Sequence, residues 1–79
     1  MLLIDTVSLM TSEDYKDRLK AEYYQTKIRY VKLKDMLENW SYLEFSPTCE
    51  KSLLRDQCEA MKKYLDILKI RCDKEGVEV

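Results

Sequence analysis

Apolar side chains recur at alternating intervals of four and three residues in two long stretches of the chain. This spacing places one residue per turn on a single face of an α-helix. We therefore expect two long helices, each with a continuous apolar seam. The first seam is Leu19, Tyr23, Thr26, Tyr30, Leu33, Leu37 and Trp40, and the second is Leu54, Cys58, Met61, Leu65, Leu68 and Cys72.

Local signals set the expected bounds of the two helices. Thr11-Ser12-Glu13-Asp14 resembles a capping box, so we expect the first helix at about residues 12–40. Pro47 disfavours helix at the residue before it but suits the first turn of a helix. We expect a connection at residues 41–48 and a second helix at about residues 49–75. The predicted fold is all-α, with two long antiparallel helices forming a helical hairpin.

Each helix also carries a second apolar line beside its seam. Two helices with two apolar lines each cannot bury all four against one another. The surplus predicts that hairpins pack together into a coiled-coil homo-oligomer; a dimeric four-helix bundle is the simplest form, and a ring or a trimer of dimers is also allowed. The expected oligomer interface is formed by Tyr24, Ile28, Val31, Tyr64 and Ile67.

Residues 1–10 are apolar and out of phase with the helix that follows, so we interpret them as an N-terminal extension. Met10 offers an alternative start. Two interpretations stay open. The first is a short segment that packs on the hairpin or on a partner, or that is disordered. The second is a swapped arm that locks an oligomer.

The composition narrows the function classes. The 79 residues suffice for one domain and include 14 basic and 15 acidic side chains, a balance that argues against duplex nucleic acid as a partner. The chain has no histidine, and its three cysteines form no C-x-x-C pair. Phosphate-binding loops and nucleophile motifs are also missing from the sequence. We predict a cytoplasmic, non-enzymatic protein without catalytic residues, metal or cofactor, and outside the membrane.

A basic and aromatic stretch is the main candidate for binding chemistry. Residues 16–34 contain seven basic and two acidic side chains, a net charge of +5 (7 − 2). One interpretation is a solvated basic flank beside a tyrosine-rich core. The other is a nucleotide site between subunits, because arginine binds phosphate in a bidentate manner and tyrosine stacks on bases. The candidate ligand-binding residues are Tyr23, Arg29, Tyr30, Lys32 and Arg71.

Several segments match a known pattern, and together they cover about residues 14–79. They are Asp14–Tyr23, Lys32–Leu37, Leu53–Gln57, Ala60-Met61, Tyr64-Leu65, Ile67-Leu68, Arg71 and Glu75–Val77. In these segments the chain resembles a family of small helical phage and prophage proteins first annotated from crAss-like phages. The resemblance implies a bacteriophage or mobile-element origin and a setting in the cytoplasm of a bacterial host. It implies no catalytic or binding residues.

The sequence leads to one main functional hypothesis and two alternatives. The main hypothesis is a phage counter-defence protein that acts as a sponge and sequesters an anionic (cyclic) nucleotide immune signal in basic-aromatic pockets between subunits. Its architecture is similar to that of small phage helical hairpins that sequester such signals. The alternatives are an anti-CRISPR-like inhibitor that binds a host defence protein, and a structural helical oligomer without a ligand.

Overall fold

The computed structural model of the protein describes residues 2–79 and contains only helical elements in that range. Two short elements come first, the 3-10 helix η1 (Leu3–Thr6) and helix α1 (Val7–Met10). The long helices are α2 (Tyr15–Glu38) and α3 (Lys51–Glu75), with the 3-10 turn η2 (Trp40–Tyr42) between them. The predicted all-α class is therefore confirmed.

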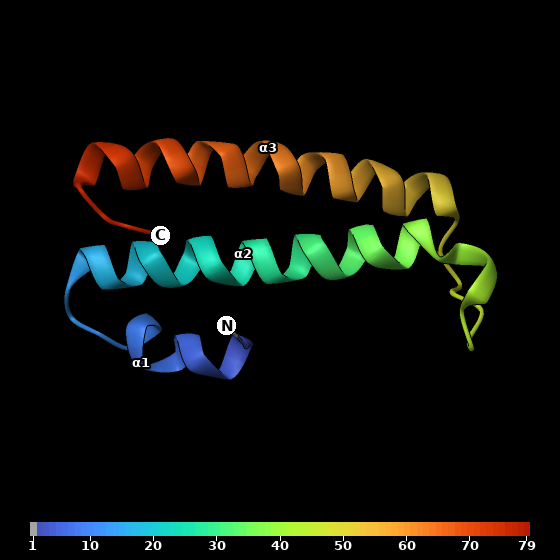
Figure 1. Ribbon diagram of the computed structural model, residues 1–79, viewed down its shortest axis with the longest axis horizontal. Coiled ribbons are helices and arrows are strands. Elements are labelled where there is room, and N and C mark those ends of the chain that lie inside the picture. The colour runs from blue at the N-terminus through green and yellow to red at the C-terminus, as the bar shows by residue number, and fades with distance from the viewer. Residues whose placement is uncertain (1) are drawn as a thin grey trace.

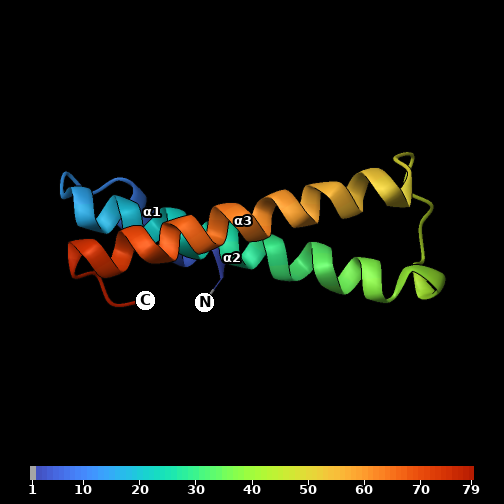
Figure 2. The same ribbon diagram turned by 90° about the horizontal axis from the view of Figure 1, so that it is seen from above.

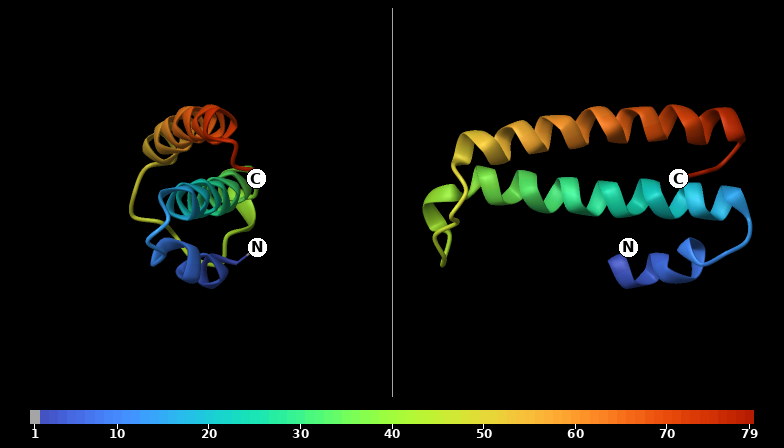
Figure 3. Two further views of the ribbon diagram at one scale, coloured as in Figure 1. Left: turned by 90° about the vertical axis from the view of Figure 1, so that its left-hand side faces the viewer. Right: turned by 180° about the vertical axis from the view of Figure 1, so that it is seen from behind.

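The elements are stacked in one row (Figure 1). Helix α2 lies in the middle, α3 runs beside it in the opposite direction, and η1 and α1 lie on the side of α2 away from α3. The end-on view in Figure 3 shows the same order. Seen from above, α2 and α3 cross, and their ends near the connection diverge (Figure 2). Helix α2 thus has a neighbour on two faces, whereas α3 has one.

Helix α2 begins at Tyr15 rather than at residue 12, because Asp14 supplies the N-cap. Its Oδ1 accepts a hydrogen bond of 2.9 Å from the backbone N–H of Lys16, which satisfies one free donor of the first turn. Ser12 lies outside the helix, where its hydroxyl accepts from the backbone N–H of Asp14 and donates to Asp17. Of the residues expected to cap the first helix, Asp14 is therefore the N-cap, and Ser12 stabilises the turn that precedes it.

The connection between the long helices is longer than expected. Helix α2 ends at Glu38, and α3 begins at Lys51 rather than at residue 49. The preceding residue, Glu50, has extended backbone angles (φ −64°, ψ 145°), which stop the helix from starting earlier. At the other end, the side chain of Asn39 donates to the carbonyl oxygen of Asp35 at 2.8 Å and helps to terminate α2.

Helix α3 ends at a glycine, Gly76, directly after the last residue of the predicted range 49–75. Gly76 has φ +69°, a left-handed conformation that costs an L side chain energy but costs glycine little. The N–H of Val77 donates to the carbonyl of Cys72 at 2.8 Å, and the N–H of Gly76 donates to Asp73, which together form a Schellman motif. The motif turns the C-terminal tail back, so that Val77 and Val79 pack against the core.

The core lies at the end of the molecule where α2 begins and α3 ends. Leu19, Tyr23, Leu68 and Cys72 form one buried cluster, in which Leu68 and Cys72 are fully buried. All four belong to the predicted seams. The seam residues nearer the connection, such as Tyr30 and Leu54, are only half-buried. The two helices therefore pack most tightly at the end where the buried cluster lies, which we call the core end.

The N-terminal segment packs on α2 of its own chain. Thr6 is completely buried; its hydroxyl donates to the carbonyl of Leu3 at 2.6 Å and accepts from the side chain of Gln25 at 3.0 Å. Ala21 on α2 is also buried, and by helical phase it lies on the face of α2 away from the seam residues Leu19 and Tyr23. Residue 1 of the predicted extension lies outside the described residues.

Candidate functional site

The pair of α2 and α3 has two lateral sides, and we name each after a residue. On the Arg71 side, the Nη2 of Arg71 donates a hydrogen bond of 2.5 Å to the hydroxyl of Tyr15, which raises the pKa of Arg71. Residues four and seven positions apart share a helix face. Ile67 and Tyr64, which are four and seven residues before Arg71, therefore lie on the same side of α3.

The Tyr24 side is the opposite one. The Tyr24 ring meets the ring of Tyr23 edge to face, with centroids 5.5 Å apart, and packs against the core cluster together with Val77 and Val79 of the tail. Val31 follows Tyr24 by two helical turns and so lies on the same face of α2. Aromatic pairs of this geometry are favourable beyond the area they bury, so the contact with Tyr23 helps to hold the Tyr24 ring in place.

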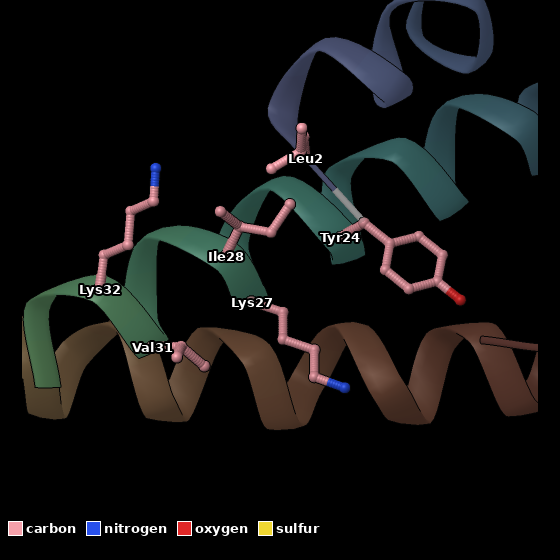
Figure 4. A pocket seen from close by; sticks show the side chains of 6 residues that line it. All are labelled: Leu2, Tyr24, Lys27, Ile28, Val31 and Lys32. Carbon is pink, nitrogen blue, oxygen red and sulfur yellow. The ribbon is translucent and has the colours of Figure 1, made fainter. Parts of the chain in front are cut away.

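A groove runs along the Tyr24 side between α2 and the N-terminal segment. It has a volume of about 320 Å³ and is lined by Leu2, Tyr24, Lys27, Ile28, Val31 and Lys32. Figure 4 shows Leu2 over Ile28, with the chains of Lys27 and Lys32 leading away in different directions. The groove thus has an apolar floor and an ammonium group at each edge.

These side chains suit a small ligand with an apolar part and a negative charge. The volume lies within the range of roughly 300–1,000 Å³ that is common for small-molecule sites. Lysine supplies a flexible point charge that can meet a phosphate or carboxylate. Isoleucine and valine offer apolar contact, and the tyrosine ring offers a flat surface on which a base or another ring can pack. We define the six lining residues as the Tyr24 groove.

The structure places the predicted ligand-binding residues at separate locations. Tyr23 is only 8% exposed, and the Nζ of Lys27 stands over its ring at 5.9 Å from the centroid. Tyr30 lines a second hollow with residues 58, 59, 62 and 63 of α3. Of the five candidates, Lys32 belongs to the Tyr24 groove.

The two candidate arginines lie outside that groove. Arg29 is exposed and follows Glu22 by two turns, and Glu22 is among the groups that act on Arg71. Both arginines therefore lie on the Arg71 side. Tyr15, the partner of Arg71, is 14 residues before Arg29, which is about 21 Å along a helix axis. One protomer does not bring the two guanidinium groups together.

The predicted oligomer residues are divided between the two sides. Tyr24, Ile28 and Val31 line the Tyr24 groove, whereas Tyr64 and Ile67 lie exposed on the Arg71 side. Sequence reasoning did not select Lys27 as a ligand residue, although it opens the acid-free segment Lys27–Lys34. The sequence signal for Lys27 was its position directly before Ile28 and five residues before Lys32.

Other kinds of site find little support in the described part of the chain. Among residues 2–79 no group of three potential metal-ligating side chains comes together. In the same range, none of the helices combines the length and the apolar character that a membrane span requires. The three cysteines, Cys49, Cys58 and Cys72, are free thiols.

These observations define a small all-helical protein with an open apolar groove that has cationic edges. The chain matches the Sequestin family over residues 13–74. This match covers most of the chain, and the protein therefore belongs to the Sequestin family. Comparisons with curated proteins and with solved structures gave no match.

Proposed function

We propose that the protein is a non-enzymatic binding protein that sequesters a small anionic nucleotide in the Tyr24 groove. The family name, Sequestin, points to sequestration. The observation that carries the choice of ligand is the position of Lys27 and Lys32 at the edges of an apolar groove that contains Tyr24. The base would lie on the groove floor, and its phosphates would draw the flexible side chains of Lys27 and Lys32 towards the groove.

The proposal includes a biological setting and a quaternary state. The protein acts in the cytoplasm of a bacterial host and originates from a bacteriophage or prophage. There it counters defence by lowering the free concentration of a (cyclic) nucleotide immune signal. It does so as a homo-oligomer. Sequestration is stoichiometric, so each protomer contributes a groove and no turnover is required.

The test is a binding assay with a panel of cyclic mononucleotides, cyclic dinucleotides and nucleotide-sugar compounds. Isothermal titration calorimetry and melting temperature report binding independently, since a tight ligand stabilises the folded state by mass action. The double variant Lys27→Glu/Lys32→Glu should lose binding of the ligand that the wild type takes. The matched control is Lys16→Glu/Lys34→Glu, which has the same charge change at exposed positions of α2 outside the groove.

The variants also separate this groove from the Arg71 side. We expect Arg29→Glu to bind as the wild type does, because Arg29 does not line the groove. Loss of binding in Arg29→Glu, with binding retained in Lys27→Glu/Lys32→Glu, would move the ligand to the other side. A wild type that binds no member of the panel but captures a host protein in stoichiometric amount would favour the protein-inhibitor hypothesis instead.

A further inference from the structure

Helix α3 carries an apolar line that the rest of residues 2–79 leaves largely exposed. Leu53, Tyr64 and Ile67 are 57%, 43% and 55% exposed, and Ala60 lies on the same line. The second apolar line of α2 has a different fate, because Leu2 lies over Ile28 (Figure 4). The surplus apolar surface predicted for α2 is therefore partly covered, and that of α3 is not.

The line continues at helical spacing from Leu53 through Gln57, Ala60, Tyr64 and Ile67 to Arg71, with steps of 4-3-4-3-4. This repeat is that of a helix that packs along another helix over several turns. A contact of this length needs a straight, regular partner. Another α3 is such a partner, and a contact between two α3 helices closes by two-fold symmetry.

We infer that α3 pairs with the α3 of a second copy of this chain, in antiparallel orientation, through Leu53, Ala60, Tyr64 and Ile67. The inference rests on the proposed homo-oligomer and names the face that forms it. With the two-fold axis near Tyr64, Ala60 of one copy lies opposite Ile67 of the other. A small side chain then faces a large one, which lets the two helices approach closely.

Charge decides between the antiparallel and the parallel orientation. The face has an acidic residue, Asp56, at its first end. Its last end has two basic residues, Arg71 and Lys74, and one acidic residue, Glu75, so the net charge there is +1 (2 − 1). An antiparallel pair places the acidic end of each copy beside the basic end of the other. A parallel pair would place Arg71 and Lys74 beside their own copies, which is repulsive.

The arrangement of existing ion pairs agrees with this choice. Within residues 2–79, the two recorded ion pairs are Lys62–Asp66 and Lys69–Asp73, each four residues apart on α3. Both lie on the flank away from the Leu53–Ile67 line, by helical phase. Four charges of that outer flank are thus paired within the helix, whereas Asp56 and Lys74 are exposed at the flank of the apolar line.

Sedimentation equilibrium of the full chain tests the inference. We expect a wild-type dimer, and a dissociation constant raised by about 100-fold or more in Ile67→Asp, because each substitution acts twice at a two-fold interface. The matched control is Ile4→Asp, at a residue of η1 that is 75% exposed, and it should leave the dimer intact. Leu53→Asp is a second variant at the interface in case Ile67→Asp loses its helical circular dichroism signal.

A charge exchange tests the orientation. Asp56→Lys and Lys74→Glu should each weaken the dimer, and the double variant should restore it. A monomeric wild type, an intact dimer in both Ile67→Asp and Leu53→Asp, or no restoration by the double variant would overturn the inference. Nucleotide binding by folded Ile67→Asp should persist, since the Tyr24 groove lies on the other side. A dimer that behaves as expected but binds no nucleotide would refute only the proposed function.

Discussion

Replacing Leu68 with alanine tests whether the stability of this molecule is concentrated at one end. Leu68 is fully buried in the cluster with Leu19, Tyr23 and Cys72. Removing a buried leucine side chain usually costs about 2–5 kcal/mol, the loss of transfer free energy plus that of the cavity. A chain of this length has a total stability of roughly 4–12 kcal/mol. We therefore expect Leu68→Ala to lose about 3 kcal/mol, a large share of the total.

The comparison variant is Leu54→Ala, at a seam residue near the connection. Leu54 is half-buried, so its truncation removes less apolar contact and should cost only about 1–1.5 kcal/mol. Urea unfolding followed by circular dichroism at 222 nm, at one fixed protein concentration, measures both losses. Equal losses, or a larger loss in Leu54→Ala, would show that the end near the connection packs as tightly as the core end, contrary to the burial described above.

Three further predictions use the same urea assay. Asp14→Ala should lower the free energy of unfolding by about 1 kcal/mol, because it removes the N-cap of α2, whereas Asp14→Ser should retain most of it. Gly76→Ala should cost about 1 kcal/mol from the left-handed backbone alone, since nothing lies within 4 Å of the added methyl; Gly76→Asn, which tolerates this conformation, should cost less. Burial raises the pKa of the Cys72 thiol, so the folded state holds this proton to a higher pH than the unfolded chain does. Stability should be unaffected below about pH 8 and fall as the pH rises from about 8.5 through the folded pKa, and Cys72→Ala should have a flatter profile between pH 7 and 9.5.

The seams were predictable because they depend on spacing alone. Leu19 and Tyr23 face the partner helix whatever the details of the connection, and so do Leu68 and Cys72. The grading of burial along the seams was not predictable in this way. It follows from the crossing of α2 and α3, which holds the core ends together and lets the ends near the connection diverge (Figure 2).

Helix bounds were predicted less closely because competing caps are decided by single hydrogen bonds. The sequence offers Thr11, Ser12 and Asp14 within four residues, and any of them could cap a helix. In the structure Asp14 caps α2, while the Ser12 hydroxyl is held by Asp14 and Asp17. The choice depends on where the chain must turn towards α1, which no local pattern encodes.

The packing of the N-terminal segment on α2 was also not predictable, because it too depends on a single hydrogen bond. Its apolar residues have no clear helical phase, so the sequence left its packing open. The decisive contact is polar: Thr6 is buried and accepts a hydrogen bond from Gln25, which lies 19 residues later. Buried polar groups need such partners, and the partner fixes the segment on α2. A search for hydrophobic periodicity does not detect a contact of this kind.

Periodicity identifies the flanking lines of each helix but not which flank of one helix meets which flank of the other. That assignment requires the relative rotation of the packed helices, which is a property of the pair. Here the rotation separates Tyr24, Ile28 and Val31 from Tyr64 and Ile67. The five residues expected to form one interface therefore occupy two sides of the molecule. This division favours a different role for each side of the molecule. The Tyr24 side combines apolar residues with Lys27 and Lys32 around a hollow, which suits a small anion. The α3 line on the Arg71 side is long and has opposite charges at its ends, which suits a second helix. Ligand binding and self-association should therefore be separable by single substitutions, an outcome that one shared interface would not allow.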